Sequence, residues 1–168
     1  MRYKDKQRNS TEPKGELASR TLAMPADSNP KGDIFGGWIM SLMDSAGKMS
    51  ATPHAGGRVV TVAVSNITFL QPVHVGDTVC CYTDVKRLGR TSITLDVEVW
   101  VLRQGQGARI KVTDAEFTFV AVHEDGSPRE LMSPSSKLQP LPARERRRSR
   151  QPRGEASAIP AERMVPWD

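Results

Sequence analysis

The interpretation of this chain starts from one stretch, MPADSNPKGDIFGGWIMSLMD, which spans residues 24–44. Its first part, Pro25–Asp33, is dense in turn-forming residues and predicts a loop. A glycine pair, Gly36–Gly37, then leads into apolar residues with helical spacing, which predict a helix from Trp38 to about Ala51. We expect this helix to be mostly buried, with one narrow polar arc that consists of Ser41, Asp44, Ser45 and Lys48.

After the helix the apolar residues alternate, which is typical of strands. The apolar face changes parity between Val64 and Ile67, so we expect a bulge near Asn66. The stretch 92–101 alternates most clearly and predicts a strand with one exposed face. Together with a first strand at 15–24, the pattern predicts four further strands, at 60–69, 78–86, 92–101 and 109–122. Short turns favour antiparallel pairing, so the expected class is α+β, with a curled antiparallel sheet around one helix.

The charge of the chain is distributed unevenly. Its 168 residues include 24 Lys and Arg against 19 Asp and Glu, a formal net charge of +5. Residues 1–19 carry +2 and residues 133–168 carry +4, whereas residues 20–132 carry −1. We expect a flexible charged leader at 1–16, one domain at 17–132 and a disordered tail rich in Pro and Arg at 133–168. The Arg-rich run 144–150 favours a solvated tail, with binding to nucleic acid or to an anionic membrane as the alternative.

Several classes of protein are disfavoured. No apolar window of about 18 residues is present, so we predict no transmembrane helix. The opening residues MRYKDKQRNS are polar and do not resemble a secretory signal. The two cysteines, Cys80 and Cys81, are adjacent and cannot join distant segments, so a reducing cytoplasmic location is expected. The three histidines lie far apart in the sequence, and we predict neither a metal site nor a cofactor.

Three features of the stretch 24–44 could carry chemistry, and each has a structural alternative. The N–H groups of Gly36 and Gly37 at a helix start could bind an oxyanion, but a glycine pair also permits close packing. A carboxylate at Asp44 is costly to bury unless it has a use, although an ordinary i,i+4 pair with Lys48 is the simpler interpretation. Asn29 could orient water or a carbonyl group, or could form a turn.

The same stretch closely resembles the start of YciA-type acyl-CoA thioesterases of the hotdog fold. The spacing N-x-x-G-x-x-x-G-G, followed by a carboxylate in the helix, is fairly specific within hotdog proteins. The resemblance covers about residues 17–130 and continues through segments 57–62, 68–73, 76–82, 91–93 and 97–101.

The resemblance implies a hotdog fold, with an antiparallel β-sheet wrapped around one long central α-helix. It also implies a homodimer formed side by side through the sheets, and a hexamer built from three dimers. Active sites would lie at the dimer interface. The reaction would be hydrolysis of acyl-CoA to free CoA and a carboxylic acid, without a cofactor.

The resemblance also assigns roles by position. Asp44 would be the catalytic carboxylate, as general base or nucleophile. Asn29 of the neighbouring subunit would orient the water or the substrate, and the N–H of Gly37, together with that of Gly36, would polarise the thioester carbonyl. Contacts to the CoA phosphates and pantetheine would come from Arg58, Arg90, Thr91 and Ser92, for which ordinary strand-end and turn chemistry is the alternative.

Two other functions remain open from the residues alone. A non-catalytic acyl-CoA binding or sensing module would keep the fold, but it has no need for both Asn29 and Asp44. The tail could bind nucleic acid or an anionic membrane in addition to any activity of the domain. A dehydratase is less well supported, because no histidine with a suitably placed acidic partner is evident. Lys48 departs mildly from the family pattern and bears on the shape of the acyl pocket.

Overall fold

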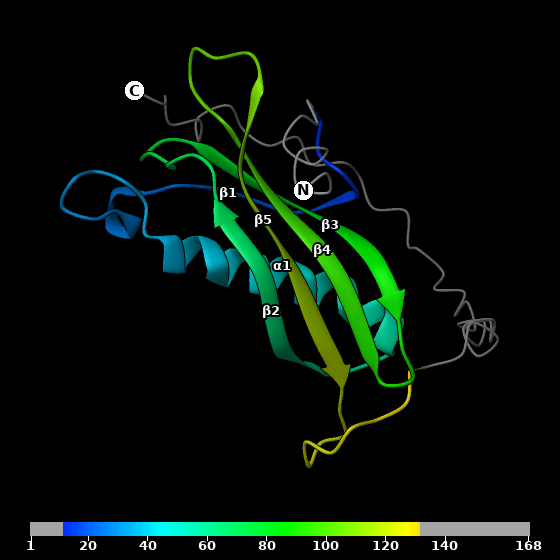
Figure 1. Ribbon diagram of the computed structural model, residues 1–168. Coiled ribbons are helices and arrows are strands. Elements are labelled where there is room, and N and C mark those ends of the chain that lie inside the picture. The colour runs from blue at the N-terminus through cyan, green and yellow to red at the C-terminus, as the bar shows by residue number, and fades with distance from the viewer. Residues whose placement is uncertain (1–11, 132–168) are drawn as a thin grey trace, which may run out of the picture. The chain divides into compact units, whose positions relative to one another are not determined.

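The computed structural model describes residues 12–131, so most of the predicted leader and all of the predicted tail lie outside the described residues. The expected order of one strand, one helix and four strands is confirmed (Figure 1). In chain order the elements are β1 (Glu16–Leu22), the 3-10 turn η1 (Pro25–Asp27), α1 (Gly36–Ala55), β2 (Val59–Phe69), β3 (Thr78–Leu88), β4 (Ser92–Leu102) and β5 (Arg109–Ala121).

The strands form one antiparallel sheet in the order β1-β3-β4-β5-β2, so β1 and β2 are its two edges. The long helix α1 lies across one face of this sheet and contacts all five strands (Figure 1). The predicted α+β class is therefore confirmed. Among residues 12–131, no helix is long and apolar enough to cross a membrane.

The core lies between α1 and the sheet face that α1 covers. Ile39, Met43 and Ala46 of the helix are buried there against the sheet. Gly47 also faces the core, and a Cβ at this position would lie 2.8 Å from the ring of Phe119, which is fully buried. The helix thus approaches β5 closely because this residue has no side chain.

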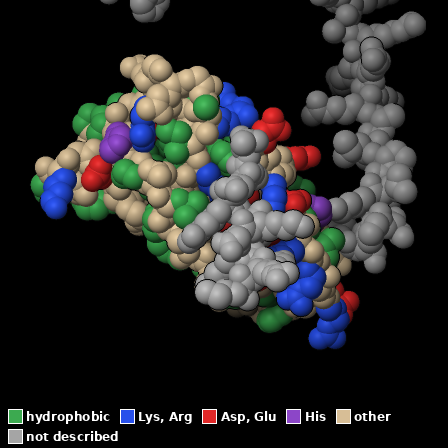
Figure 2. Space-filling view, turned by 45° about the horizontal axis from the view of Figure 1, so that its top comes forward, with side chains coloured by type: hydrophobic (Ala, Val, Ile, Leu, Met, Phe, Trp, Pro, Cys, Tyr) green, Lys and Arg blue, Asp and Glu red, His purple; other side chains and the backbone are tan. Residues whose placement is uncertain are grey.

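The helix differs from the prediction in its ends and in its burial. It begins at Gly36 and continues past Pro53 to Ala55; proline there costs one hydrogen bond, near an exposed end. The expectation of a mostly buried helix is wrong, because Met40 and Met49 are 39% and 52% exposed. The sheet covers only one side of α1. Hydrophobic side chains also reach the surface at several places on the face shown in Figure 2.

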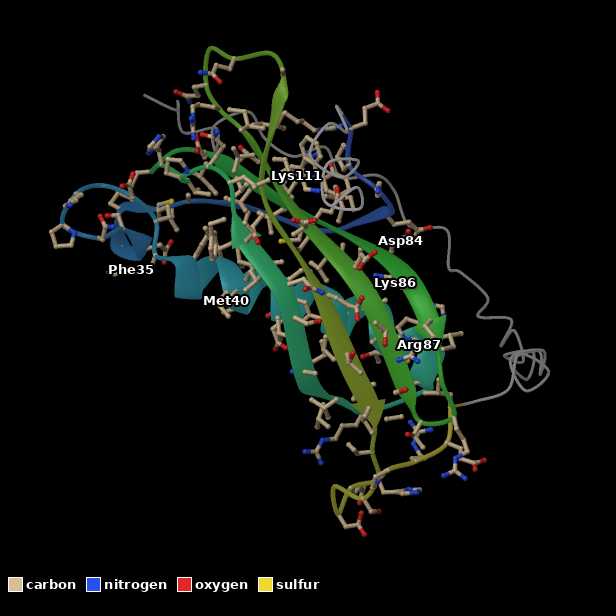
Figure 3. The ribbon with its side chains drawn as sticks, viewed as in Figure 1. Phe35, Met40, Asp84, Lys86, Arg87 and Lys111 are labelled. Carbon is tan, nitrogen blue, oxygen red and sulfur yellow. The ribbon has the colours of Figure 1, made fainter. Side chains whose placement is uncertain are left out.

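The strand β4 is not half-exposed, contrary to its alternating pattern. Thr94, Glu98 and Trp100 point away from α1, yet they are only 3%, 5% and 2% exposed. The reason is the central position of β4, where side chains of its neighbours flank it. Glu98 accepts hydrogen bonds from Trp100 Nε1 at 2.9 Å and from Lys111 Nζ at 3.0 Å. Figure 3 shows Lys111 and Lys86 on this outer face.

The edge strand β2 has the predicted bulge, and its alternating valines are largely exposed. The bulge near Asn66 is present: the pairing with β5 shifts between Ser65 and Thr68, and Asn66 has a φ of 59°. The apolar face expected from Val60 onward does not form the core. Val62 and Val64 are 55% and 40% exposed.

Candidate active site

Asp44 lies in the third turn of α1, on the side of the helix that faces the edge strand β2. Its Oδ1 accepts a hydrogen bond from Thr61 Oγ1 of β2. Its Oδ2 lies 3.4 Å from Lys48 Nζ, so the i,i+4 pair considered from the sequence is also present. The Asp44 side chain is 35% exposed, which keeps it accessible from the β2 edge. A carboxylate held in this way can take a proton from water or attack an acyl group.

Thr61 was not among the residues that the sequence singled out. The valines around it indicated a core face on the even-numbered positions, and Thr61 has the opposite parity. In the structure it is Thr61 that meets the helix. The available signal was a threonine that alternates with valines in the strand that follows the helix of Asp44.

The two glycines at the start of α1 differ in their surroundings. A Cβ on Gly36 would lie 3.3 Å from the ring of Phe69, so packing accounts for a glycine there. A Cβ on Gly37 would meet nothing within 4 Å, so packing does not account for the second glycine. The N-cap residue, Phe35, has no side-chain hydrogen bond to the helix. Among the described residues, the N–H groups of Gly36 and Gly37 have no backbone acceptor.

Asn29 does form the turn that was considered as its structural role. Its Oδ1 accepts hydrogen bonds from the backbone N–H of Lys31 at 2.9 Å and of Asp33 at 3.1 Å. These two bonds use the acceptor end of the amide. The Nδ2 group makes no hydrogen bond to another described residue and remains a donor. The turn and a role toward a ligand are therefore compatible.

One chain does not bring these groups to a single point. Gly37 and Asp44 are seven residues apart on α1, which corresponds to about 10 Å along the helix axis. Asn29 lies in the loop before the helix, at the same end as Gly36 and Gly37. The structure therefore places the amide donors at one end of α1 and the carboxylate with Thr61 near its middle.

The four residues expected to contact CoA lie at the other end of the helix. The Arg58 carbonyl accepts a hydrogen bond from Val122 N–H, and the Thr91 carbonyl accepts one from Ala121 N–H. The segments that carry Arg58 and Thr91 therefore lie on either side of the end of β5. Arg58 Nη1 donates to the Glu124 carbonyl at 3.2 Å. Arg90 is 83% exposed and lies 3.9 Å from Glu130, next to Thr91 and to Ser92, the first residue of β4.

Arg129 joins this group although the sequence did not point to it. Its guanidinium lies over Gly57, where a Cβ would be 3.0 Å from Nη2. The hydrogen bond from Arg129 N–H to the Ala121 carbonyl returns the chain to the end of β5. This end of the domain therefore carries three guanidinium groups from separate segments, a suitable arrangement for binding phosphate.

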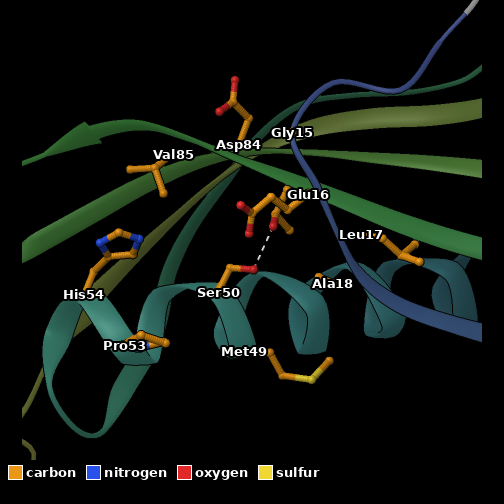
Figure 4. Close-up of a pocket in the computed structure, with 11 residues that line it drawn as sticks. Gly15, Glu16, Leu17, Ala18, Met49, Ser50, Pro53, His54, Asp84 and Val85 are labelled. Carbon is orange, nitrogen blue, oxygen red and sulfur yellow. Dashed lines mark hydrogen bonds between the residues drawn. The ribbon is translucent and has the colours of Figure 1, made fainter.

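A cavity of about 520 Å³ lies on the other flank of α1, at the β1 edge (Figure 4). Met49, Ser50 and His54 of the helix face Leu17 of β1 and Thr83 of β3 across it, and Ser50 and Thr83 share a hydrogen bond of 2.7 Å. Neither Asp44 nor Asn29 lines it. Among residues 12–131, no group of three or more His, Cys, Asp or Glu side chains is arranged to hold a metal ion.

Comparisons with known proteins identify the superfamily and the relatives of this chain. The profile of the thioesterase superfamily matches residues 31–108. The acyl-CoA thioester hydrolase YciA of Salmonella typhimurium is 56% identical over 122 residues, which cover 71% of this chain and 92% of that protein. The hexameric thioesterase y2039 from Yersinia pestis superposes with a TM-score of 0.69 at 56% identity, over 73% of this chain and 99% of that one.

A second solved structure is that of HI0827, a hexameric broad specificity acyl-coenzyme A thioesterase. It superposes with a TM-score of 0.70 at 51% identity, over 75% of this chain and 87% of that one. The sheet, the helix and the matched span define a hotdog-fold thioesterase. Within this superfamily, the chain belongs to the family of YciA acyl-CoA thioester hydrolases.

Proposed function

We propose that this protein hydrolyses acyl-CoA thioesters to free CoA and a carboxylic acid, in active sites shared between two copies of the chain. The observation that carries the proposal is the carboxylate of Asp44, held by Thr61 beside an accessible sheet edge. The YciA relatives are acyl-CoA thioester hydrolases, and this supports the substrate class.

Asp44 supplies the proton chemistry in this proposal. As a general base it takes a proton from water, whose oxygen attacks the thioester carbon; the C–S bond then breaks and the proton passes to the CoA thiolate. As a nucleophile it attacks the thioester carbon, the C–S bond breaks and CoA leaves as the thiolate, so that a mixed anhydride remains. Water then hydrolyses the anhydride to the carboxylic acid and the free Asp44 carboxylate, and the proton released from water passes to the CoA thiolate. Both routes need the carboxylate ionised and fixed in orientation, which is the role of the hydrogen bond from Thr61 to Oδ1.

The amide donors stabilise the charge that develops on the thioester oxygen. The free N–H of Gly37, with that of Gly36, points out from the positive end of the α1 dipole. Asn29 adds its Nδ2 group as a donor to the water or to the carbonyl oxygen. Because Gly37 and Asp44 of one chain are about 10 Å apart along the helix, the donors act with the Asp44 of a second copy.

The β2 edge is the surface through which two copies meet in this proposal. It is eleven residues long and exposes Val62, Val64 and Phe69, while Phe35 and Met40 add exposed apolar area near the start of α1 (Figure 3). A long apolar edge strand is normally covered by a partner. We further propose that dimers assemble into hexamers, the form that the relatives from Yersinia pestis and HI0827 are described as having.

The phosphates and pantetheine of CoA are assigned to Arg58, Arg90, Thr91 and Ser92, with Arg129 added from the structure. The remaining proposals concern the whole chain. The protein acts in the cytoplasm, needs no cofactor, and consists of a charged leader (1–16), the thioesterase domain (17–132) and a Pro- and Arg-rich tail (133–168) that has no part in the chemistry.

The first experiment measures thiol release from short, medium and long acyl-CoAs. Asp44→Asn should abolish turnover while CoA binding persists. Asn29→Asp keeps the Oδ1 acceptor and removes the donor, so it should also lose kcat. Asp84→Asn, on the outer face of the sheet, is the matched control and should keep full activity (Figure 3). Full activity of Asp44→Asn would contradict the assignment, and binding without turnover in the wild type would favour a sensing module.

The second experiment tests the sharing of the site. In the proposal, dimers of Asn29→Ala chains and dimers of Asp44→Ala chains contain no complete site and turn over much more slowly than the wild type, whereas a mixed dimer contains one intact site. Unfolding the two variants together and refolding them should recover about a quarter of the wild-type activity, because half of the dimers are mixed and each has one working site of two. No recovery in refolded mixed dimers would place the whole site within one chain.

A further inference from the structure

The loop that carries Asn29 is closed by its own two ends. The N–H of Asn29 donates to the Asp33 carbonyl at 2.7 Å, and the N–H of Asp33 donates back to Asn29 Oδ1 at 3.1 Å. Gly32 N–H adds a bond to the Asn29 carbonyl at 2.9 Å. Asn29 and Asp33 are thus coupled, and a displacement of one displaces the other.

Asp33 is held from outside the loop by His74, which lies between β2 and β3. The Nδ1 atom of His74 is 3.2 Å from Asp33 Oδ1. The two residues also form an isolated antiparallel bridge, and Ile34 N–H donates to the Val73 carbonyl at 2.9 Å next to it. The side chain of His74 therefore contacts Asp33, the residue that exchanges two hydrogen bonds with Asn29 across the loop.

His74 is itself fixed to the core of the domain. Its backbone N–H donates to Asp77 Oδ2 at 3.0 Å, and Asp77 is only 2% exposed. Arg103 binds both carboxylate oxygens of Asp77, with Nε–Oδ1 at 3.0 Å and Nη2–Oδ2 at 2.7 Å. Burial alone would raise the pKa of Asp77, but the bonds from Arg103 and from His74 N–H hold this pKa below its ordinary value.

We propose that His74 is a positioning residue for the thioester reaction: by holding Asp33 it fixes the orientation in which Asn29 presents Nδ2 to the shared site. The inference rests on the proposed function. It assigns a role to a histidine for which the sequence indicated only a structural or surface position.

The exposure of His74 and Asp33 makes it possible to distinguish a positioning role from a contribution to stability. His74 and Asp33 are 45% and 43% exposed, so their contact contributes little to the stability of the whole domain. A small change in the direction of Nδ2, in contrast, acts directly on the group that binds the reacting water or carbonyl. Loss of the contact should therefore change kcat and leave the unfolding temperature unchanged.

The test uses the full-length protein and thiol release from a saturating acyl-CoA. His74→Leu should lower kcat about three- to fivefold, the effect expected for the loss of one exposed side-chain contact, with KM and Tm unchanged. His74→Gln restores a side-chain donor toward Asp33 and should recover most of the lost rate. His123→Leu, an exposed histidine after β5, is the matched control and should equal the wild type.

A double-mutant cycle then shows whether His74 acts through Asn29. In the Asn29→Ala background, His74→Leu should have no further effect on kcat. An unchanged kcat in His74→Leu, or the same three- to fivefold loss in both backgrounds, would overturn the inference. A wild-type kcat in Asn29→Ala alone would instead contradict the proposed role of Asn29, so the two failures are distinguishable.

Discussion

Replacing Thr61 with valine removes one hydrogen bond from the candidate catalytic carboxylate and changes little else. Valine keeps the β-branched shape and the strand preference of threonine. Thr61 is half-buried between β2 and α1, and its hydroxyl bonds to Asp44 Oδ1. The other oxygen of Asp44 has only the longer contact with Lys48 at 3.4 Å. Without Thr61 the carboxylate loses the contact that fixes its orientation.

The size of the effect follows from the charge of the acceptor. A hydrogen bond to an ionised group contributes about 1.5–3 kcal/mol, and each 1.36 kcal/mol of barrier corresponds to about tenfold in rate. We expect kcat of Thr61→Val to fall roughly 10- to 150-fold in a thiol-release assay, with KM close to that of the wild type. Thr61→Ser keeps the hydroxyl and should stay within about threefold of the wild type.

Thr118→Val provides the matched control. Thr118 lies on β5, and its hydroxyl pairs with that of Thr94 at 3.4 Å, away from Asp44. This variant should keep its kcat. A Thr61→Val enzyme with more than half of the wild-type kcat, folded and oligomeric as the wild type, would refute the idea that Thr61 orients the base.

Three further predictions concern stability, the helix start and assembly. Arg103→Leu removes the ion-pair partner of the buried Asp77 and should lower the free energy of unfolding by about 3 kcal/mol at pH 7. Because the folded pKa of Asp77 lies below its ordinary value of 3.8, the difference between variant and wild type in urea unfolding should be full above about pH 3.8. It should shrink at lower pH and vanish only below the depressed folded pKa, where Asp77 is protonated in both states. Gly37→Ala should lower kcat, because the methyl group crowds the N–H, and should leave Tm unchanged, because the methyl group meets no other atom. Gly47→Ala forces a methyl group against Phe119 and should lower the free energy of unfolding by about 1–3 kcal/mol, measured by thermal unfolding. Val62→Asp should shift the protein to monomers in sedimentation velocity without unfolding it, since Val62 is exposed within one chain.

The local pattern was sufficient to predict the elements, whereas the catalytic candidates came from the resemblance to a known family and stay predictions. Alternation and helical spacing located every strand and the helix, and the bulge at Asn66 followed from a change of parity. The pattern failed where burial depends on a neighbour. The alternating apolar residues of β2 lie on an edge strand and are exposed within one chain. The alternation in β4 placed Glu98 on an exposed face, but Trp100 and Lys111 cover it.

The parts of the candidate site that the sequence did not predict are contacts between distant segments. Thr61 meets Asp44 across 17 positions of the chain, and no spacing rule links them. His74 reaches the Asn29 loop only because the segment before β3 runs beside it. The sequence and its resemblance therefore supplied the residues that touch the substrate in the proposal, except Arg129, and missed Thr61 and His74, which orient them.

The unequal edges of the sheet also bear on how assembly stops. β1 has seven residues and a register shift between Leu17 and Ser19, whereas β2 has eleven residues and exposed valines. Two copies that join through β2 in a twofold arrangement use up both attractive edges at once. What they leave at either end is a strand of only seven residues, a shorter template for a third chain. Such a sheet terminates its own growth, which protects a concentrated enzyme from forming fibres.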